Sequence, residues 1–369
     1  MIPFLIGAFS LVLSALFFFL PLYLKGTLEF SGGQIGVLYA VLSLNAILVA
    51  FPYGVVGDRY PVRVLTRLSL VGAAVSLWAM ASVKGFWPFF LAFWGYGLSV
   101  QGFIRSLEIL VFKDITTSAA LRFGEYHAWR MGGWTLGSLL GGGLIYALDF
   151  PLTLKFLAVA VCLLLIPTFW LPLTPGQRVP LFQYGRDLLR GPVLFFAAWL
   201  FLFCLHWGAE TTSYALFLKD NLGLNLWQIG LYMAGEFAVL GVTTYFYGRT
   251  WAGRFKPFTF MGLALITSGA GFILMTFPPV GWSFAMRALH GFGDAIILMV
   301  SYTTVAEFFH VDRIGGNSGL IAMVTTMGTL SGALVFGPVG ANFGYHIPLI
   351  CAGVITLGLV PLAYAGLKD

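Results

Sequence analysis

Long apolar runs follow one another along the whole chain, and only short polar stretches separate them. A helix of about 20 residues can cross the hydrocarbon core of a bilayer, which is ~30 Å thick. The runs do not alternate in polarity with a period of two, which excludes a transmembrane β-barrel. We therefore predict an all-α membrane protein. Its twelve predicted spans are residues 2–24, 35–57, 64–82, 86–112, 125–148, 151–173, 192–219, 228–249, 257–277, 281–308, 317–340 and 346–366.

The second half of the chain repeats the first at an offset of about 194 residues. The matching segments are Leu22–Lys25 with Leu216–Lys219, Gln34–Gly36 with Gln228–Gly230, and Gly133, Gly137 and Gly142 with Gly328, Gly332 and Gly337. Internal repeats are common in transporters, which bind their substrate between two similar bundles. We predict two pseudo-symmetric six-helix bundles, residues 1–173 and 192–369, joined by a cytoplasmic linker at 174–191. The shared glycines predict close helix packing in both.

Composition limits the partners of the chain. Only 9% of its residues are charged and 59% are hydrophobic, whereas soluble domains contain about 25% charged residues. The predicted spans also leave no stretch of sequence long enough for a soluble domain. We expect the partners to be the lipid bilayer and a small-molecule substrate, and not nucleic acid, although the formal net charge is +6. We expect the chain to act as a monomer.

Lys and Arg set the predicted orientation, because cytoplasmic loops carry an excess of both. With both termini in the cytoplasm, thirteen fall on the inner side and four on the outer side. The inner residues are Arg59, Arg63, Arg67, Lys113, Arg122, Arg178, Arg186, Arg190, Arg249, Arg254, Lys256, Arg313 and Lys368, and the outer ones are Lys25, Lys84, Lys155 and Lys219. We predict a multi-pass protein of a cell membrane, most simply a bacterial inner membrane.

A charged motif follows the second predicted span. The segment Gly54–Arg63 reads G-V-V-G-D-R-Y-P-V-R and resembles G-x-x-x-D-R-x-G-R-[RK], which the major facilitator superfamily carries between helices 2 and 3. Pro61 and Val62 depart from that signature. Together with the twelve spans and the linker, the resemblance covers the whole chain and implies the major facilitator fold. It also implies a role in conformational switching for Gly54, Asp58, Arg59 and Arg63, whose charges could instead only set the topology.

Ionisable residues inside the first-half spans form a candidate site, because a charge costs about 2.5 to 3.5 kcal/mol at the bilayer centre. Gln101, Arg105 and Glu108 are spaced by four and three residues, which places them on one helix face. Glu108 could pair with Arg105 or with Arg130 of the next span. An ion pair with a purely structural role is the alternative for Arg105 and Glu108.

The second half carries a larger set of polar residues within its spans. Its members are His206 and Glu210 in the seventh span, Glu236 in the eighth, and Arg287, His290 and Asp294 in the tenth, with Asn45 of the second span at similar depth. The three residues of the tenth span share one face. Acids beside histidine and arginine can link proton binding to a change of conformation. His206 could instead be a core histidine that donates to a carbonyl.

Four segments carry a narrower resemblance. HWGAETTSYALFL (206–218), GEFAVL (235–240), WRMGGWTLGSLLGGG (129–143) and RALHGFGD (287–294) look like the branch with the phenylpropionate permease, the nucleoside proton symporters and lactose permease. This resemblance implies substrate contacts at Glu108 and Arg130. It implies proton coupling at Glu236, His290 and Asp294. The histidine and the acid are four apart where lactose permease has three, and no charge lies in the ninth span. We add Glu210 to the coupling group, and Arg105, His206, Arg287 and Asn45 to the substrate group.

Missing motifs narrow the function. The sequence has no G-x-x-x-x-G-K-[ST] phosphate loop, no His or Cys pair at zinc spacing and no G-x-S-x-G nucleophile elbow. We therefore expect neither an enzyme nor a cofactor. We predict a secondary transporter that moves a nucleoside, a sugar or an aromatic carboxylate by alternating access with proton symport.

One alternative is a proton-coupled exporter of drugs or metabolites. The G-P-x-x-G signature of such antiporters belongs in the fifth span, which here reads Gly141-Gly142-Gly143 without proline. A receptor or a lipid scramblase is an alternative from another class, but it would leave the intramembrane charges without an explanation.

Overall fold

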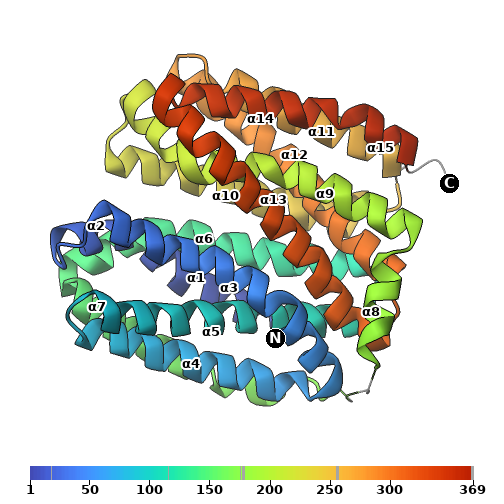
Figure 1. Cartoon of the computed structure of the whole chain (residues 1–369), viewed down its shortest axis with the longest axis horizontal. Helices are drawn as coiled ribbons and strands as arrows, with labels where there is room; N and C mark the ends of the chain where they lie inside the picture. The colour runs from blue at the N-terminus through green and yellow to red at the C-terminus, as the bar shows by residue number, and fades with distance from the viewer. Residues whose placement is uncertain (18, 115, 175, 177–178, 255–256, 367–369) are drawn as a thin grey trace. The chain divides into compact units, whose positions relative to one another are not determined.

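The computed structural model describes residues 1–17, 19–114, 116–174, 176, 179–254 and 257–366, and within these ranges all regular structure is helical (Figure 1). The first seven helices are α1 (Ile2–Phe17), α2 (Leu20–Gly26), α3 (Gly32–Arg59), α4 (Val62–Ser82), α5 (Phe86–Lys113), α6 (Ala119–Leu148) and α7 (Phe150–Leu163). The next eight are α8 (Leu181–Leu188), α9 (Gly191–Ala209), α10 (Leu226–Phe246), α11 (Pro257–Leu274), α12 (Val280–Phe308), α13 (Ile314–Phe343), α14 (His346–Gly358) and α15 (Val360–Gly366).

Short turns of other helix types extend or precede several of these helices. Two are 3-10 turns, η1 (Ile166–Trp170) and η5 (Val311–Arg313). Three are π-helical, namely η2 (Glu210–Tyr214), η3 (Phe217–Asn221) and η4 (Tyr247–Trp251). Single π-helical turns are rare and often lie at functional sites. The turn η2 is therefore of interest, because it begins at Glu210, one of the predicted site residues.

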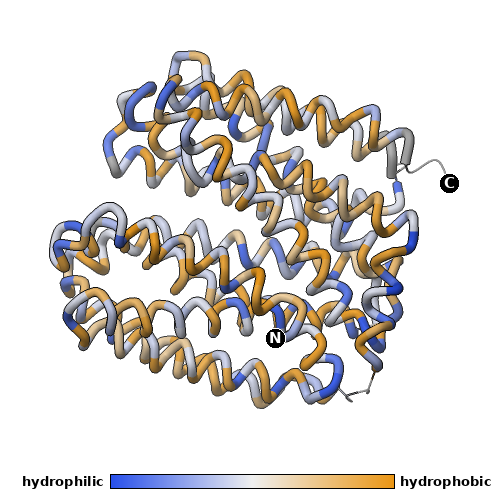
Figure 2. Tube along the Cα trace, viewed as in Figure 1, coloured by the Kyte–Doolittle hydropathy of each residue, from blue (hydrophilic) through white to orange (hydrophobic). Residues whose placement is uncertain are grey.

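Eight helices in the described ranges are long and apolar enough to cross a membrane, and hydrophobic residues dominate along them (Figure 2). They span Gly32–Arg59, Val62–Ser82, Phe150–Trp170, Gly191–Tyr214, Trp227–Trp251, Val280–Phe308, Val311–Phe343 and His346–Tyr364. The helices α5 and α6 contain 28 and 30 residues, which is also enough to span a bilayer. The chain is thus a multi-pass integral membrane protein, and the count of twelve crossings stays a prediction.

Large apolar side chains on the outer helix surfaces support this conclusion. Leu68 and Val75 of α4 are each 63% exposed, and Leu91 of α5 is 64% exposed. Contiguous apolar surface of this kind is rare on soluble monomers. A hydrocarbon environment suits it, because the helical backbone already satisfies its own hydrogen bonds.

The chain divides into two compact units. Unit 1 comprises Met1–Thr116, Trp129–Tyr184 and Phe309–Met323, and unit 2 comprises Thr117–Ala128, Gly185–Phe308 and Val324–Asp369. Within unit 1, α5 packs along α3 and α4, and α4 packs along α7. Within unit 2, α12 packs along α10 and α11, and α11 packs along α14. The division into six-helix bundles at residues 1–173 and 192–369 stays a prediction.

The polar segment 174–191 contains the helix α8, which the sequence analysis did not predict. Its Tyr184 is fully buried within unit 1. Three of the basic residues that set the predicted orientation, Arg178, Lys256 and Lys368, lie outside the described residues. The orientation itself stays a prediction.

The duplication is visible in how two helices begin. Gln34 donates its backbone N–H to the Ser31 hydroxyl at 3.3 Å, and its side chain accepts the Ser31 N–H at 2.9 Å. Asn225 and Gln228 form the same reciprocal pair at the start of α10, with both distances 2.9 Å. Such a capping box satisfies two backbone donors that a helix start leaves free. This explains why glutamine recurs at the repeat offset.

The repeated glycines allow the closest helix contacts. A Cβ added to Gly133 of α6 would overlap the carbonyl group of Gly7 in α1, within unit 1. A Cβ added to Gly332 of α13 would overlap the carbonyl group of Leu205 in α9, within unit 2. Without a side chain, each pair of backbones can approach closely, which supplies the packing that drives association in lipid. The predicted close packing is confirmed at these positions.

We expect Gly133→Ala to lower the melting temperature and the folded yield, whereas Gly132→Ala should be neutral or stabilising. A Cβ at residue 133 would meet the backbone of Gly7 and lie 2.9 Å from the Cβ of Ser10, whereas nothing lies within 4 Å of a Cβ at residue 132. Helix propensity alone favours alanine by about 1 kcal/mol at both positions. Thermal melts of the two purified variants in one detergent measure the difference, and equal melting temperatures would contradict the packing.

The charged motif after the second span lies mostly inside a helix, which differs from the predicted loop. Helix α3 continues to Arg59, so Gly54 and Asp58 occupy its last two turns. It ends before Pro61, because proline disfavours a helical conformation in the residue that precedes it. Tyr60 is accordingly extended, with φ −125° and ψ 157°. The acid is thereby held on a rigid element.

Candidate functional site

Six ionisable residues from four helical elements meet inside unit 2, and we call them the buried network. They are His206 of α9, Glu210 of η2, Glu236 of α10, and Arg287, His290 and Asp294 of α12. From sequence, Glu210, Glu236, His290 and Asp294 are predicted to couple protons, and His206 and Arg287 to bind substrate. The structure brings all six into one connected set. Arg287 and both histidines are each only 1% exposed, and Glu210, with a side chain 18% exposed, is the most accessible member.

Arg287 is the centre of the network. Its guanidinium donates from one terminal nitrogen to Glu210 and from the other to Glu236. Its charged carbon also lies 4.3 Å from the centre of the Tyr214 ring, a cation–π arrangement that favours the positive charge. A buried arginine needs such partners, because an unpaired charge in this environment is strongly destabilising. Both terminal nitrogens of the guanidinium therefore donate to acids of the protein itself.

Three polar side chains contact the two carboxylate oxygens of Asp294. Trp207 donates its indole N–H to Oδ2 at 3.0 Å, and the Ser268 hydroxyl donates to Oδ1 at 2.6 Å. The Nε2 atom of His206 lies 3.0 Å from Oδ2. Ser268, which enters from α11, could not be selected from sequence, because a single serine in an apolar helix is too common to be a signal. Trp207 could not be selected either, although it follows His206 directly.

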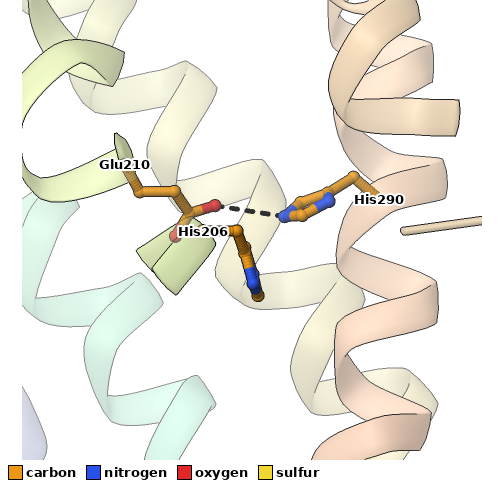
Figure 3. A group of neighbouring side chains, drawn as sticks. All are labelled: His206, Glu210 and His290. Carbon is orange, nitrogen blue, oxygen red and sulfur yellow. Dashed lines mark hydrogen bonds and ion pairs between the residues drawn. The ribbon is translucent and has the colours of Figure 1, made fainter. Parts of the chain in front are cut away.

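His290 joins the two parts of the network. Its Nε2 lies 3.1 Å from Oε1 of Glu210 (Figure 3) and 3.6 Å from Oδ2 of Asp294. Its Nδ1 lies 2.8 Å from the backbone carbonyl of Ser268. The network therefore runs without a break from Glu236 through Arg287, Glu210 and His290 to Asp294 and His206.

Three of these residues also satisfy the spacing of a metal site. His206, Glu210 and His290 each offer one ligand atom, and these atoms lie within 4.8 Å of one another. However, Oε1 of Glu210 already accepts from Arg287, and Figure 3 shows the ring nitrogens of His206 turned away from the Glu210–His290 pair. The arrangement is better suited to hydrogen bonding within the protein than to metal coordination.

A smaller ion-pair group lies in unit 1. Glu108 of α5 is 1% exposed, and its Oε2 lies 2.6 Å from a terminal nitrogen of Arg105 on the same helix. Arg130 of α6 lies farther away, 3.9 Å from Oε1. Glu108 thus pairs with both candidates. Asn45 of α3 is fully buried and donates to the backbone carbonyl of Trp94 at 3.2 Å, which ties α3 to α5.

Asp58 of the charged motif binds the start of α13. Its carboxylate accepts the backbone N–H groups of Gly315 and Gly316 at 3.0 and 2.8 Å. Lys113 lies 3.2 Å away. A carboxylate suits a helix N-terminus, where free N–H groups and the helix dipole favour negative charge. Gly54 is required beside it, since a Cβ there would overlap the backbone of Gly315.

Tyr184 of α8 completes the Asp58 contacts, donating its hydroxyl to Oδ2 at 3.2 Å. Burial raises the pKa of this hydroxyl and the negative charge of Asp58 raises it further, so Tyr184 stays a donor at physiological pH. The two arginines of the motif bind elsewhere. Arg59 donates to the carbonyl of Val179 at 3.0 Å and Arg63 to that of Phe169 at 3.4 Å. The sequence analysis missed Tyr184, Lys113 and the two glycines, which are distant in the chain.

We expect Asp58→Asn to slow transport by at least tenfold. The amide keeps the shape of the side chain but removes the charge, and a hydrogen bond to a charged group contributes about 1.5 to 3 kcal/mol. The α3–α13 contact should then open more readily. A cysteine introduced near Gly315, at Ser318→Cys, can report this opening by its rate of labelling. The control is Asp312→Asn, since that side chain is 34% exposed. Unchanged transport and labelling would contradict the role of Asp58 as a latch.

Comparisons with known proteins agree with this architecture. The sequence profile of the Major Facilitator Superfamily matches residues 4–249 and 199–369. The class B tetracycline resistance protein of Escherichia coli is 24% identical over 341 residues, which cover 88% of this chain and 82% of that protein. The multidrug resistance protein MdtG of Enterobacter lignolyticus is 24% identical over 376 residues, or 95% and 86% of the two chains.

Two solved structures share the fold. The human organic anion transporter MFSD10 (TETRAN) superposes with a TM-score of 0.79 at 19% identity, covering 98% of each chain. The transporter FucP in its outward conformation superposes with a TM-score of 0.78 at 12% identity, covering 100% of this chain and 98% of the other. Since the profile matches nearly the whole chain, the protein belongs to the major facilitator superfamily and is a membrane transporter rather than an enzyme.

Proposed function

We propose that this protein is a proton-coupled secondary transporter that moves a small organic solute by alternating access. The observation that carries the proposal is the buried network, in which three carboxylates, two imidazoles and one guanidinium form one connected set inside unit 2. Ionisable groups at membrane depth are costly, and they mark ion pathways and proton relays in transporters. An ion-pair network that only stabilised the fold would not need two histidines.

Proton binding can change this network because its charges are not balanced. With neutral imidazoles, Glu210, Glu236 and Asp294 carry three negative charges against the single positive charge of Arg287. A proton added to Glu210 or Glu236 weakens the ion pair of that carboxylate with Arg287. The helices that carry these residues are then free to shift. Protonation and conformation thus control each other.

We assign solute binding to the remaining polar residues that the sequence analysis selected. Glu108, Arg105 and Arg130 form the polar group of unit 1, and Asn45 is buried on the neighbouring helix. His206 and Arg287 belong to the buried network itself, which would place solute and proton close enough to influence each other. A nucleoside, a sugar or an aromatic carboxylate each offers groups that such acids and guanidinium ions can bind.

The direction of transport has two candidates. Symport follows from the likeness to the phenylpropionate permease, nucleoside symporter and lactose permease branch. Antiport is favoured by the names of the relatives, which are tetracycline and multidrug resistance proteins. We keep symport as the first proposal because the fifth predicted span lacks the proline of the antiporter signature. We propose further that the protein is a monomer of a bacterial inner membrane, with twelve spans and both termini cytoplasmic.

Solute-induced proton movement tests the proposal. A thermal-shift screen of the purified protein against uridine, lactose, phenylpropionate and tetracycline would first select a solute that stabilises it. In proteoliposomes with an internal pH dye, that solute should then move protons as it crosses. Flow in the same direction as the solute supports symport, and opposed flow supports antiport. Solute transport without any proton movement would overturn the coupling.

A further inference from the structure

The tautomers of the two histidines in the buried network can be assigned from their backbone contacts. The Nδ1 atom of His206 lies 2.5 Å from the carbonyl oxygen of Phe203, and Nδ1 of His290 lies 2.8 Å from the carbonyl oxygen of Ser268. A carbonyl oxygen can only accept a hydrogen bond. We therefore assign a proton to Nδ1 of both rings. The Ser268 hydroxyl does not change this, because it donates to Asp294.

Each Nε2 atom then faces a carboxylate oxygen. Nε2 of His206 lies 3.0 Å from Asp294, and Nε2 of His290 lies 3.1 Å from Glu210. A bare ring nitrogen and an ionised carboxylate would repel each other at these distances, since both present lone pairs. One hydrogen must therefore lie in each contact, whether the nitrogen or the oxygen holds it. The geometry requires two protons.

The charge of the site gives the same number independently. Glu210, Glu236 and Asp294 contribute three negative charges, and Arg287 contributes one positive charge. Uncompensated charge is expensive in a buried environment. Among the described residues, the other titratable groups that face the network are Tyr214, Tyr232 and Cys204, which are neutral near pH 7. Two added protons make the network neutral.

We infer that the buried network is a two-proton site, with one exchangeable proton in the His206–Asp294 contact and one in the His290–Glu210 contact. This inference rests on the proposed proton coupling and adds its stoichiometry. The two contacts are linked, because His290 also lies 3.6 Å from Asp294. Loss of one proton leaves a negative charge that favours retention of the other, so the second proton leaves less readily than the first.

Histidine nitrogen NMR tests the tautomers directly. The protein has five histidines, and with ¹⁵N-labelled histidine in lipid vesicles at pH 7, His206→Gln and His290→Gln identify the two signals by their loss. Both rings should carry a proton on Nδ1. A ring with a bare Nδ1 and a protonated Nε2 would overturn the assignment. This measurement uses the wild-type protein as its reference, so it does not depend on the variants being active.

Proton counting tests the stoichiometry. Purified protein in detergent is taken from pH 10 to pH 5, and bound protons are counted with an indicator dye. Glu210→Gln and Asp294→Asn should each bind one proton fewer than wild type, and the double variant two fewer, after subtraction of the same difference measured for Asp312→Asn. A double variant that differs by one proton or none overturns the two-proton site. If the double variant differs by one proton or none but the wild type still couples solute to protons, the two-proton site is wrong and the proposed function stands. If the double variant differs by two protons but the wild type shows no coupled transport, only the coupling is overturned.

Discussion

Asp294→Asn should abolish uphill, pH-driven transport while leaving exchange of solute across the membrane intact. Asparagine has the same shape, and its single oxygen can still accept from either Trp207 or Ser268, which donate to different oxygens of Asp294 at 3.0 and 2.6 Å. It cannot ionise, so the proton between Asp294 and His206 is lost from the cycle. We expect at least a tenfold fall in accumulation against a gradient, because lost bonds to a charged group correspond to about 1.5 to 3 kcal/mol. Exchange needs no net proton movement and should persist.

Accumulation and exchange can be measured in the same proteoliposomes, with and without an imposed pH gradient. Glu236→Gln should give the same separation, since Glu236 is held by Arg287. The matched control is Asp312→Asn, which removes a carboxylate that lies outside the buried network. Uphill accumulation that survives in both Asp294→Asn and Glu236→Gln would show that the coupling residues have been assigned wrongly.

Arg287→Met should destabilise the protein more than any other single change in the network. Methionine replaces the aliphatic part of the arginine side chain but leaves Glu210 and Glu236 buried without their cation. Removal of one partner from a buried ion pair costs about 3 to 5 kcal/mol, because the remaining charge is uncompensated. A large fall in melting temperature follows. Arg249→Met is the matched control, because Arg249 is exposed and such residues contribute little.

The mechanism of this loss can be separated from a simple packing defect. If the unpaired acids cause it, Arg287→Met combined with Glu210→Gln and Glu236→Gln should regain much of the lost stability. If the triple variant melts as low as Arg287→Met alone, the shape of the arginine side chain matters more than its charge. Thermal melts in one detergent at pH 7 compare all three variants.

The helical class and the polar face of α12 could be predicted because both depend on local spacing. Residues three and four apart on α12 must share a face, so Arg287, His290 and Asp294 could be grouped from sequence. Uncompensated acids at membrane depth also require partners, which favoured grouping His290 and Asp294 with Glu210 and Glu236 as coupling residues. The repeated glycine positions could be interpreted in the same way, because close packing in lipid needs small residues at a fixed period.

The remaining contacts depend on the tertiary arrangement and left no local signal. Ser268 donates to Asp294 from a helix that carries no charge, and Tyr184 reaches Asp58 across 126 positions of sequence. The two backbone N–H groups that bind Asp58 belong to glycines whose side chains carry no information. Sequence also could not decide that Arg287 binds two acids of the protein itself, since the same guanidinium suits a substrate carboxylate equally well.

The π-helical turn η2 places one extra residue within the helix at the depth of Glu210. In the first copy of the repeat, α1 ends at Phe17 and α2 begins at Leu20, near the corresponding position. Conversion of η2 to α-helical geometry would rotate every following residue by about 100° around the helix axis. Tyr214 would then turn away from Arg287. The helix that contains η2 thus has a place where the residues after Glu210 can rotate while those before it stay fixed.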